Sequence, residues 1–178
     1  MPSEVEVLIL QHPMEVANAK GSARLLHLSL PNSRMATGEV FDEEELRALL
    51  SAPRHSVLLY PDTPVGQTPG LRTPPPFDPA WTVQPRHLRL VVLDGTWRKS
   101  RKMLYLNPLL QTLPRLPLRD TPPSHYLIRK AHLPDQLSTL EASCYALAQL
   151  ENDTLKFQPL IAAFDGFVAQ QLSYIRAT

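Results

Sequence analysis

Short apolar runs, separated by polar or proline-containing turns, constrain the fold of this 178-residue chain more than any other feature. Unbroken apolar runs of strand length are typical of parallel strands that are buried on both faces. Helical patterns separate several of these runs, and that alternation predicts an α/β fold with a largely parallel sheet flanked by helices on both sides. The predicted strands span residues 5–10, 25–30, 56–60, 88–93 and 125–129.

Helix starts are marked by side chains that can accept hydrogen bonds from free backbone N–H groups. Asp42 precedes EEELRALL with Glu45 at capping-box spacing, and Ser138 with Glu141 marks the start of LSTLEASCYALAQLE. A third helix is predicted for WRKSRKMLYL, after Thr96. The tail PLIAAFDGFVAQQLSYIRA should form an amphipathic helix, and the last two helices should both pack on the sheet. The apolar stripe of the tail consists of Ile161, Phe164, Val168, Leu172 and Ile175.

The most informative segment is LRLVVLDGTWRKSRKML, in which a buried-strand pattern ends in Asp94-Gly95-Thr96-Trp97 and then becomes basic. A phosphatase loop would carry its nucleophilic carboxylate two residues before Asp94, but Val92 occupies that position. Open α/β folds bind ligands at the carboxyl edge of the sheet, where this motif should lie. Gly95 permits a tight turn with close ligand approach, and Thr96 can cap the helix. The alternative is that Asp94 and Thr96 serve only the turn and the cap, while Trp97 belongs to the core.

Proline is abundant, with 19 residues against six glycines, and eight of the prolines lie in residues 61–86. That segment has no regular period, so it should form a long, stiff, non-helical excursion. Loops of this length inside a compact domain are usually lids or binding loops. The alternative is a surface insertion without function.

Composition places the chain among globular proteins, since 43% of its residues are hydrophobic and 20% are charged. The single Cys144 excludes an internal disulfide and a cysteine-rich zinc site, so no metal is expected and a reducing cytoplasm is the simplest location. No apolar run has the length of a membrane span, and the N-terminus lacks the pattern of a signal peptide. We therefore expect one cytoplasmic domain, residues 1–178, with no membrane contact.

Cations gather in the middle of the chain although the net charge is only +1. At helical spacing Trp97, Arg101 and Leu104 share one side, while Lys99 and Lys102 project elsewhere. Such a helix could bind phosphates, although solvated cations on a helix are commonplace. A second basic group, Arg129, Lys130 and His132, precedes the capped helix at Ser138, whose first N–H groups suit an anionic ligand group. The pattern is equally that of an ordinary strand, loop and helix.

Taken together, these residues resemble the DTW-domain family, named for the Asp-x-Thr-Trp motif that Asp94, Gly95, Thr96 and Trp97 match. Other blocks that resemble the family, in its order, are LILQHPMEVANAKGSARLLHLSLPNS, LLYP, LDGTWRKSRKMLYLNPLLQTLPRLPL and YLIRKAHLPDQLSTLEA. The resemblance runs from about Leu8 to the C-terminus and points to the bacterial tRNA-uridine aminocarboxypropyltransferases. The chain departs from many members in having no N-terminal cysteine cluster.

The resemblance implies a SPOUT-like α/β fold with a C-terminal trefoil knot. It also implies an activity, the transfer of the 3-amino-3-carboxypropyl group of S-adenosylmethionine to N3 of a tRNA uridine, in the variable loop. The partner would then be tRNA and the cofactor S-adenosylmethionine. Two rival functions stay open, a methyltransferase on the same fold and a non-catalytic RNA-binding module.

The site expected from the resemblance centres on Asp94, either as the general base for uridine N3, as a group that orients the uracil ring, or as an anion for the ammonium or sulfonium of the cofactor. The residues expected at the cofactor are Leu59, Tyr60, Pro61, Leu93, Asp94, Gly95, Thr96, Trp97, Tyr126, Leu127, Arg129, Leu137 and Ser138. Those expected to contact RNA are Lys20, Arg24, Arg98, Lys99, Lys102, Arg129 and Lys130.

Overall fold

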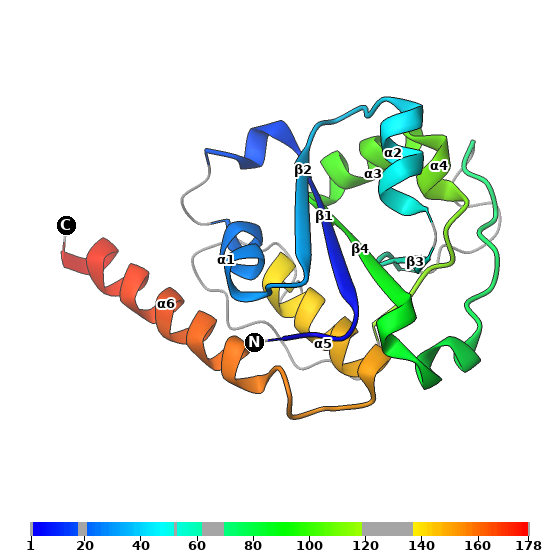
Figure 1. Cartoon of the computed structure of the whole chain (residues 1–178). Helices are drawn as coiled ribbons and strands as arrows, with labels where there is room; N and C mark the ends of the chain where they lie inside the picture. The colour runs from blue at the N-terminus through cyan, green and yellow to red at the C-terminus, as the bar shows by residue number, and fades with distance from the viewer. Residues whose placement is uncertain (1, 18–20, 52, 62–69, 119–136, 178) are drawn as a thin grey trace.

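In the part of the chain that the structure describes, a four-stranded, entirely parallel sheet forms the centre of the molecule, with the strand order β2-β1-β4-β3 (Figure 1). The computed structural model describes residues 2–17, 21–51, 53–61, 70–118 and 137–177. The strands are β1 Glu6–Gln11, β2 Ser33–Thr37, β3 His55–Leu58 and β4 Leu88–Asp94. The predicted α/β class with a parallel sheet flanked by helices is confirmed.

The two central strands, β1 and β4, are buried almost throughout because helices cover both faces of the sheet. Their side chains alternate between two apolar clusters. Val7, Ile9 and Leu90 belong to one cluster, whereas Leu8 and Val91 belong to the other. This alternation explains why the sequence shows continuous apolar runs here rather than a polar–apolar pattern.

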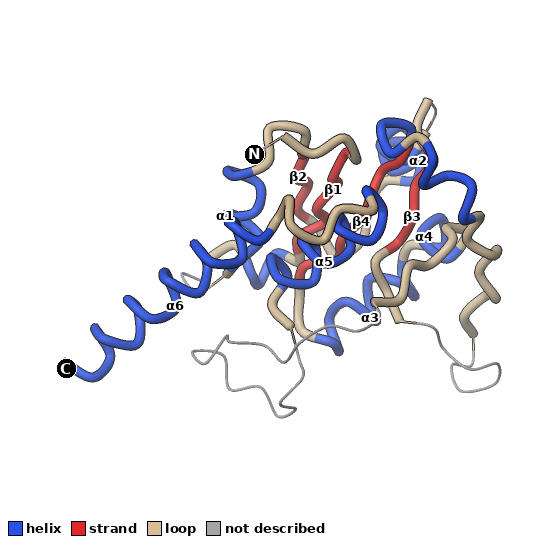
Figure 2. Tube along the Cα trace, turned by 90° about the horizontal axis from the view of Figure 1, so that it is seen from below, coloured by secondary structure: helices blue, strands red, loops and turns tan. Residues whose placement is uncertain are grey.

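Helices α1 Ser22–Ser29 and α5 Thr139–Glu151 cover the first face of the sheet. Helix α6 Gln158–Ala177 packs against α5 through Ile161, Phe164 and Val168, which are buried. The predicted position of α5 on the sheet is therefore confirmed, and α6 forms an outer layer behind it. Figures 1 and 2 show the C-terminal end of α6 extending away from the sheet. The side chains of Leu172 and Ile175, predicted for the same stripe, lie outside the described residues.

Helices α2 Glu43–Leu50, α3 Trp97–Leu106 and α4 Pro108–Gln111 cover the second face. Leu46, Met103 and Leu110 are their buried contacts with the cluster around Leu8 and Val91. Because helices cover both faces of the sheet, a ligand can approach the sheet at the two ends of its strands.

The predicted helix starts are confirmed. The Asp42 carboxylate accepts a hydrogen bond from the Glu45 N–H, and the Thr96 hydroxyl accepts one from the Lys99 N–H. Ser138 and Glu141 form a complete capping box, in which each side chain bonds the backbone N–H of the other. These caps are local, so short sequence motifs suffice to place them.

The strand predicted at residues 25–30 is wrong, because these residues form most of α1. Ala23, Leu26 and Leu30 are buried while Leu28 is 72% exposed, which is a helical period that a continuous apolar run conceals. The strand in this region is instead β2, which pairs with β1 along one edge of the sheet. Its sequence SRMAT is polar and half-exposed, so an apolar run does not reveal it.

The proline-rich excursion is only partly non-helical. Short 3₁₀ helices occupy Pro79–Val83 and Pro85–His87, each with proline in its first turn, where the missing N–H is not needed. A further 3₁₀ helix spans Pro13–Glu15. Residues 62–69 of the excursion, the predicted strand at 125–129 and the segment expected to complete a knot lie outside the described residues.

Within the part of the chain that the structure describes, no helix has the length and apolar character needed to span a bilayer.

Candidate functional site at the carboxyl edge of the sheet

A pocket of about 400 Å³ opens at the carboxyl edge of the sheet, next to the end of β4. Its size lies in the usual range for small-molecule sites, and most of its lining residues are apolar. The walls come from the segments that follow β3 and β4, from residues 116–118 and from the start of α5. The lining residues are Leu59, Tyr60, Pro61, Val92, Leu93, Gly95, Trp97, Ser100, Leu116, Pro117, Leu118, Leu137, Ser138, Thr139 and Ala142.

Eight of the residues expected at the cofactor line this pocket: Leu59, Tyr60, Pro61, Leu93, Gly95, Trp97, Leu137 and Ser138. Two others, Asp94 and Thr96, adjoin it without forming its wall. The remaining three, Tyr126, Leu127 and Arg129, lie outside the described residues, as do Lys20 and Lys130. The pocket therefore unites three chain segments that the sequence analysis could only place at the same edge.

Asp94 is buried behind the pocket wall, with 2% of its surface exposed. Its Oδ1 accepts a hydrogen bond of 2.7 Å from the Thr139 hydroxyl, and its Oδ2 accepts one of 3.2 Å from Gln11 Nε2. Gln11 is also the partner of Asp94 in the last pair of the β1–β4 ladder. Asp94 thus connects the ends of two central strands to the first turn of α5, through donors that carry no charge.

The start of α5 is already well satisfied by the protein itself. The Glu141 N–H bonds the Ser138 hydroxyl, and the Leu140 N–H donates to the Ser22 hydroxyl on α1 at 3.0 Å. The expected row of free N–H groups for an anionic ligand is therefore largely used within the fold. What this turn presents to the pocket is the side chains of Ser138 and Thr139.

Aromatic rings form one side of the pocket. Trp97 stacks on Tyr60 with a centroid distance of 5.1 Å and an interplanar angle of 16°. The guanidinium of Arg115 lies 5.0 Å from the Tyr60 ring centroid. Burial raises the pKa of Tyr60 above its ordinary value, and the positive charges of Arg115 and Arg101 oppose that rise. Tyr60 is 5% exposed whereas Trp97 is 51% exposed, so Trp97 is the outer member of the stack.

Close packing, rather than an unusual backbone angle, disfavours a larger residue at Gly95. A Cβ atom at this position would lie 3.2 Å from Lys99 Cβ and 3.5 Å from His12 Cβ. The turn between β4 and α3 therefore lies tightly between α3 and the chain that follows β1. The sequence predicted that Gly95 allows close approach to a ligand. In the structure Gly95 lines the pocket and also packs closely against Lys99 and His12.

The cations of α3 divide into two groups. Lys99 forms an ion pair of 3.2 Å with the buried Glu15, and Lys102 forms one of 3.1 Å with Glu39. His12 contacts Glu39 at 2.7 Å through Nε2 while its Nδ1 accepts from the Met14 N–H, so the hydrogen lies on Nε2. These contacts, His12 first and Lys102 second, lower the pKa of Glu39.

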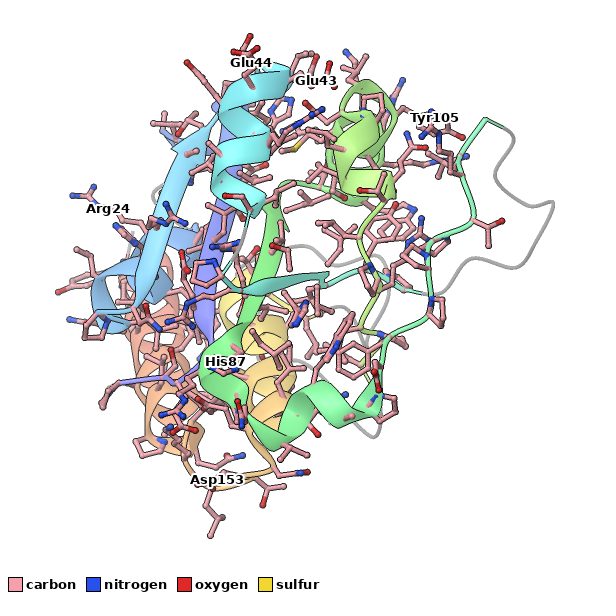
Figure 3. All side chains as sticks on the ribbon, turned by 45° about the vertical axis from the view of Figure 1, so that its right-hand side comes forward. Arg24, Glu43, Glu44, His87, Tyr105 and Asp153 are labelled. Atoms are coloured by element: carbon pink, nitrogen blue, oxygen red, sulfur yellow. The ribbon has the colours of Figure 1, made fainter. Side chains whose placement is uncertain are left out.

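Arg98 and Arg101 are exposed and have no acidic partner among the described residues, although Arg101 lies over the Tyr105 ring at 5.8 Å. Arg24, also expected to contact RNA, is distant from this group. Figure 3 shows Arg24, on α1, and Tyr105, on α3, at opposite sides of the molecule. Among the described residues expected to contact RNA, the exposed cation without an acidic partner near the pocket is therefore Arg98, on α3.

Several pocket residues were missed by the sequence analysis: Val92, Ser100, Leu116, Pro117, Leu118, Thr139 and Ala142. Residues 114–116 run beside β3, with Leu58 N–H bonded to the Pro114 carbonyl and Leu116 N–H bonded to the Leu58 carbonyl. The apolar LPRLPL pattern is a signal for this extended segment. The sequence signal for Thr139 is clearer, because this residue directly follows the capping Ser138 at the carboxyl edge.

A comparison with known families places the chain by sequence. The model of the family described as "DTW domain" matches residues 1–172, which is nearly the whole chain. The chain belongs to the DTW domain family. Asp94, Gly95, Thr96 and Trp97, the residues on which the resemblance was based, lie at the carboxyl edge and next to or within the pocket.

Curated relatives of this DTW chain are proteins named tRNA-uridine aminocarboxypropyltransferase 2. The Mus musculus protein is 27% identical over 93% of this chain, and the Drosophila melanogaster protein is 27% identical over 94%. The Macaca fascicularis protein is 26% identical over 93% of this chain. The chain spans 54% to 64% of the length of these animal relatives, which is less than two thirds. No solved structure matches the DTW chain significantly.

Proposed function

We propose that this DTW chain transfers the 3-amino-3-carboxypropyl group of S-adenosylmethionine to N3 of a tRNA uridine. The observation that carries the proposal is the pocket at the carboxyl edge of the sheet, where Gly95 and Trp97 of the family motif form part of the lining. The names of the curated relatives support the transferred group and the tRNA uridine as its acceptor, while the donor and the N3 position come from the family resemblance. The wider fold assignment, a SPOUT-like protein with a C-terminal trefoil knot, is part of the same proposal.

The residues of the pocket fit a nucleoside with a charged, polar arm. Leu59, Leu93 and Leu116 offer apolar surface for a purine ring, and Ser138 and Thr139, at the start of α5, add two hydroxyl-bearing side chains to the lining. The volume of about 400 Å³ suits one ligand of this size. Within the described residues, no group of three histidine, cysteine, aspartate or glutamate side chains is arranged to hold a metal ion.

S-adenosylmethionine supplies an electrophilic γ-carbon, which becomes bonded to uridine N3 as the bond from that carbon to sulfur breaks and 5′-methylthioadenosine leaves. The N3 proton must be lost as the new bond forms. The pocket must therefore keep the methyl group away from the RNA and present the γ-carbon in line with the departing sulfur. Gly95 and Trp97 line the part of the wall nearest the solvent-exposed start of α3, which makes this the side for RNA entry.

Among the roles that the sequence left open for Asp94, the geometry favours that of an anion facing the sulfonium charge. Both of its oxygens accept hydrogen bonds, and the side chain is 2% exposed, so direct contact with a uridine ring would require these bonds to break. Gln11 and Thr139 fix the carboxylate without neutralising it. No cation among the described residues pairs with Asp94, and a buried anion held only by neutral donors favours a cationic ligand over a neutral one.

This role also separates the donor from its product. The sulfonium of the donor is positively charged, whereas the sulfur of 5′-methylthioadenosine is neutral. A negative charge at Asp94 would stabilise the bound donor and not the product, so the product would leave more easily. Arg98, the exposed α3 cation of the predicted RNA contacts, is retained as a phosphate contact, while the acid partners of Lys99 and Lys102 favour a role in holding α3 in place.

The deciding experiment incubates the purified protein with S-adenosylmethionine and unmodified tRNA, digests the RNA and determines nucleoside masses. We expect a uridine heavier by one aminocarboxypropyl group, with release of 5′-methylthioadenosine. A methyluridine with S-adenosylhomocysteine would instead show the rival methyltransferase. Binding of tRNA without donor binding and without any modified nucleoside would show the non-catalytic module and refute the proposal.

A further inference from the structure

The outer face of the Trp97–Tyr60 stack is a large aromatic surface at the mouth of the pocket. Trp97 lines the pocket yet is 51% exposed, whereas tryptophan side chains are highly buried on average. Tyr60 holds the inner face of the indole at a near-parallel angle of 16°. Tyr60 is itself 5% exposed and lies near the guanidinium of Arg115, so the inner ring of the stack is held in place by its surroundings.

Positive charge lies beside this aromatic surface. On the α3 helix Arg101 is one turn beyond Trp97, and its charge is close enough to act on Tyr60. Arg101 also lies over the Tyr105 ring, 5.8 Å from its centroid, which directs the guanidinium along the same side of the helix. Arg101 was not among the residues that the sequence analysis expected to contact RNA.

The neighbouring lysines differ from the arginines in their surroundings. Lys99 and Lys102 point to the other side of α3, where Glu15 and Glu39 accept their charges at 3.2 and 3.1 Å. Arg98 and Arg101 have no such partner within the described residues. An exposed aromatic ring next to a cation that lacks an acidic partner is the arrangement by which proteins bind unstacked RNA bases and the adjoining phosphate.

We propose that Trp97 is the platform on which the acceptor uracil stacks, with Arg101 binding the phosphate beside it. The inference rests on the proposed function, because it places the acceptor base above the donor pocket. Trp97 would then determine the acceptor rather than bind the adenosine of the donor, as the family resemblance had suggested. A uracil ring stacked on the exposed face of the indole would lie at the pocket mouth. Its N3 would then be directed towards the donor in the pocket.

Two dissociation constants test the platform. We expect Trp97→Leu to weaken binding of an unmodified tRNA transcript on the order of 10- to 100-fold, since base–aromatic stacking is lost. Binding of S-adenosylhomocysteine, used as an unreactive probe of the donor pocket, should not change. Trp97→Phe should recover part of the tRNA affinity because it restores an aromatic face. Loss of S-adenosylhomocysteine binding with unchanged tRNA binding would overturn the proposal.

Fluorescence provides a direct readout of stacking. The chain has two tryptophans, so Trp81→Phe leaves Trp97 as the sole emitter, and Trp81 itself stacks on His55 away from the pocket lining. A stem–loop RNA with one loop uridine should quench Trp97, and the same RNA with an abasic loop position should not. Equal quenching by both RNAs would contradict stacking.

Salt dependence tests Arg101 against a matched residue on the same helix. Arg101→Gln should reduce the slope of log affinity for tRNA against log salt by about 0.7 to 0.9. Lys102→Gln should change the slope less, because Glu39 already balances that charge. Equal slopes for the two variants would overturn the assignment of Arg101.

Failure of the platform is distinguishable from failure of the proposed function. Wild-type protein that forms aminocarboxypropyl-uridine while Trp97→Leu keeps full tRNA affinity would refute the platform alone. Wild-type protein that forms no such product, with the tRNA affinity and the quenching both dependent on Trp97, would refute the proposed reaction and support the platform.

Discussion

Two buried carboxylates lie at opposite ends of the same pair of strands, and different groups hold them. Glu6 forms the first pair of the β1–β4 ladder with Arg89, and Asp94 forms the last pair with Gln11. Glu6 is surrounded by arginines, with Arg34 at 2.7 Å, Arg54 at 3.2 Å and Arg89 at 3.3 Å. Asp94 has only the neutral donors Gln11 and Thr139 among the described residues.

Because of this difference, the charge of Glu6 has a structural role, whereas among the described residues the charge of Asp94 remains available to a ligand. At the amino edge of the sheet the charge of Glu6 is neutralised within the fold, and no lining residue of the pocket belongs to that network. At the carboxyl edge the Asp94 carboxylate, directly behind the pocket wall, is held by two neutral donors and by no cation among the described residues. The amino edge should therefore govern stability, and the carboxyl edge should govern ligand selection.

The largest effect is expected at the amino edge. Arg89 is 3% exposed and also donates to the Ser51 carbonyl and the Ser56 hydroxyl. Arg89→Met removes these bonds and should lower the free energy of unfolding by about 3 kcal/mol, as for other broken buried pairs. Urea denaturation measures this loss, and the affinity for S-adenosylhomocysteine should not change.

Arg34→Gln is the matched control for Arg89→Met, because its side chain is 49% exposed and contacts the same carboxylate. An exposed pair contributes little, so the loss should stay below about 1 kcal/mol. The comparison of the two edges breaks down if Arg89→Met alters ligand affinity and leaves the free energy of unfolding unchanged.

The next effect concerns the charge of Asp94. Asp94→Asn keeps an oxygen acceptor for Thr139, and Gln11 can rotate its amide to accept from the new NH₂ group, so the fold should persist. We expect the affinity for S-adenosylmethionine to fall about tenfold or more, as a nearby opposite charge is removed. The affinity for S-adenosylhomocysteine, which has a neutral sulfur, should be retained. Isothermal titration calorimetry with each ligand gives the ratio of the two affinities.

A different result would assign Asp94 another role. A fall in single-turnover rate with both affinities unchanged would indicate a general base or a group that orients the uracil. An equal fall in both affinities would indicate that Asp94 acts by holding Thr139 and the pocket wall in position.

A smaller effect is expected from one of the two neutral donors. Thr139→Val removes the hydroxyl that donates to Asp94 Oδ1 at 2.7 Å while keeping the shape of the side chain. The loss should be about 1 kcal/mol in donor affinity, the usual net value of a single hydrogen bond. Thr139→Ser keeps the hydroxyl and should bind the donor like the wild type. If Thr139→Ser lost as much affinity as Thr139→Val, the missing methyl group rather than the hydrogen bond would be responsible.

The single cysteine reports on which edge has been disturbed. Cys144 is fully buried in the core, and burial raises the pKa of its thiol to about 12, so the native protein presents no reactive thiolate near neutral pH. Labelling by a thiol reagent should therefore proceed through opening of the fold. Arg89→Met should accelerate labelling and Asp94→Asn should change its rate least. Similar acceleration by both variants would show that Asp94 also governs stability.

The features predictable from the sequence are those whose signals are local. The buried runs of β1 and β4 are consecutive in sequence, and the caps at Asp42, Thr96 and Ser138 need only the residues three positions on. By contrast, α1 was predicted as a strand because LLHLSL is both an apolar run and a helical stripe. The strand β2 was not predicted because SRMAT is polar and pairs only along one edge of β1. A single sequence does not show which other segment a given segment pairs with or packs against.

The candidate site was predictable to the same extent. The DTW motif placed Asp94 and Trp97 at a ligand edge, and the structure brings Leu59 and Ser138 to the same pocket. The bond between Asp94 and Thr139 joins residues 45 positions apart, and the bond to Gln11 joins residues 83 apart. The acid partners that distinguish Lys102 from Arg101 come likewise from a distant segment. Spacing along the chain does not reveal such pairs.

The length of the β1–β4 ladder has a consequence for changing this protein by design. Glu6 and Gln11 are five residues apart on one strand, so the two carboxylates are separated by roughly 16 Å at the usual rise of a parallel strand. Substitutions that far apart, with no shared partners, generally have additive effects. Stability gained or lost at the amino edge should therefore leave donor selection at the carboxyl edge as it was, and each edge can be rebuilt without readjusting the other.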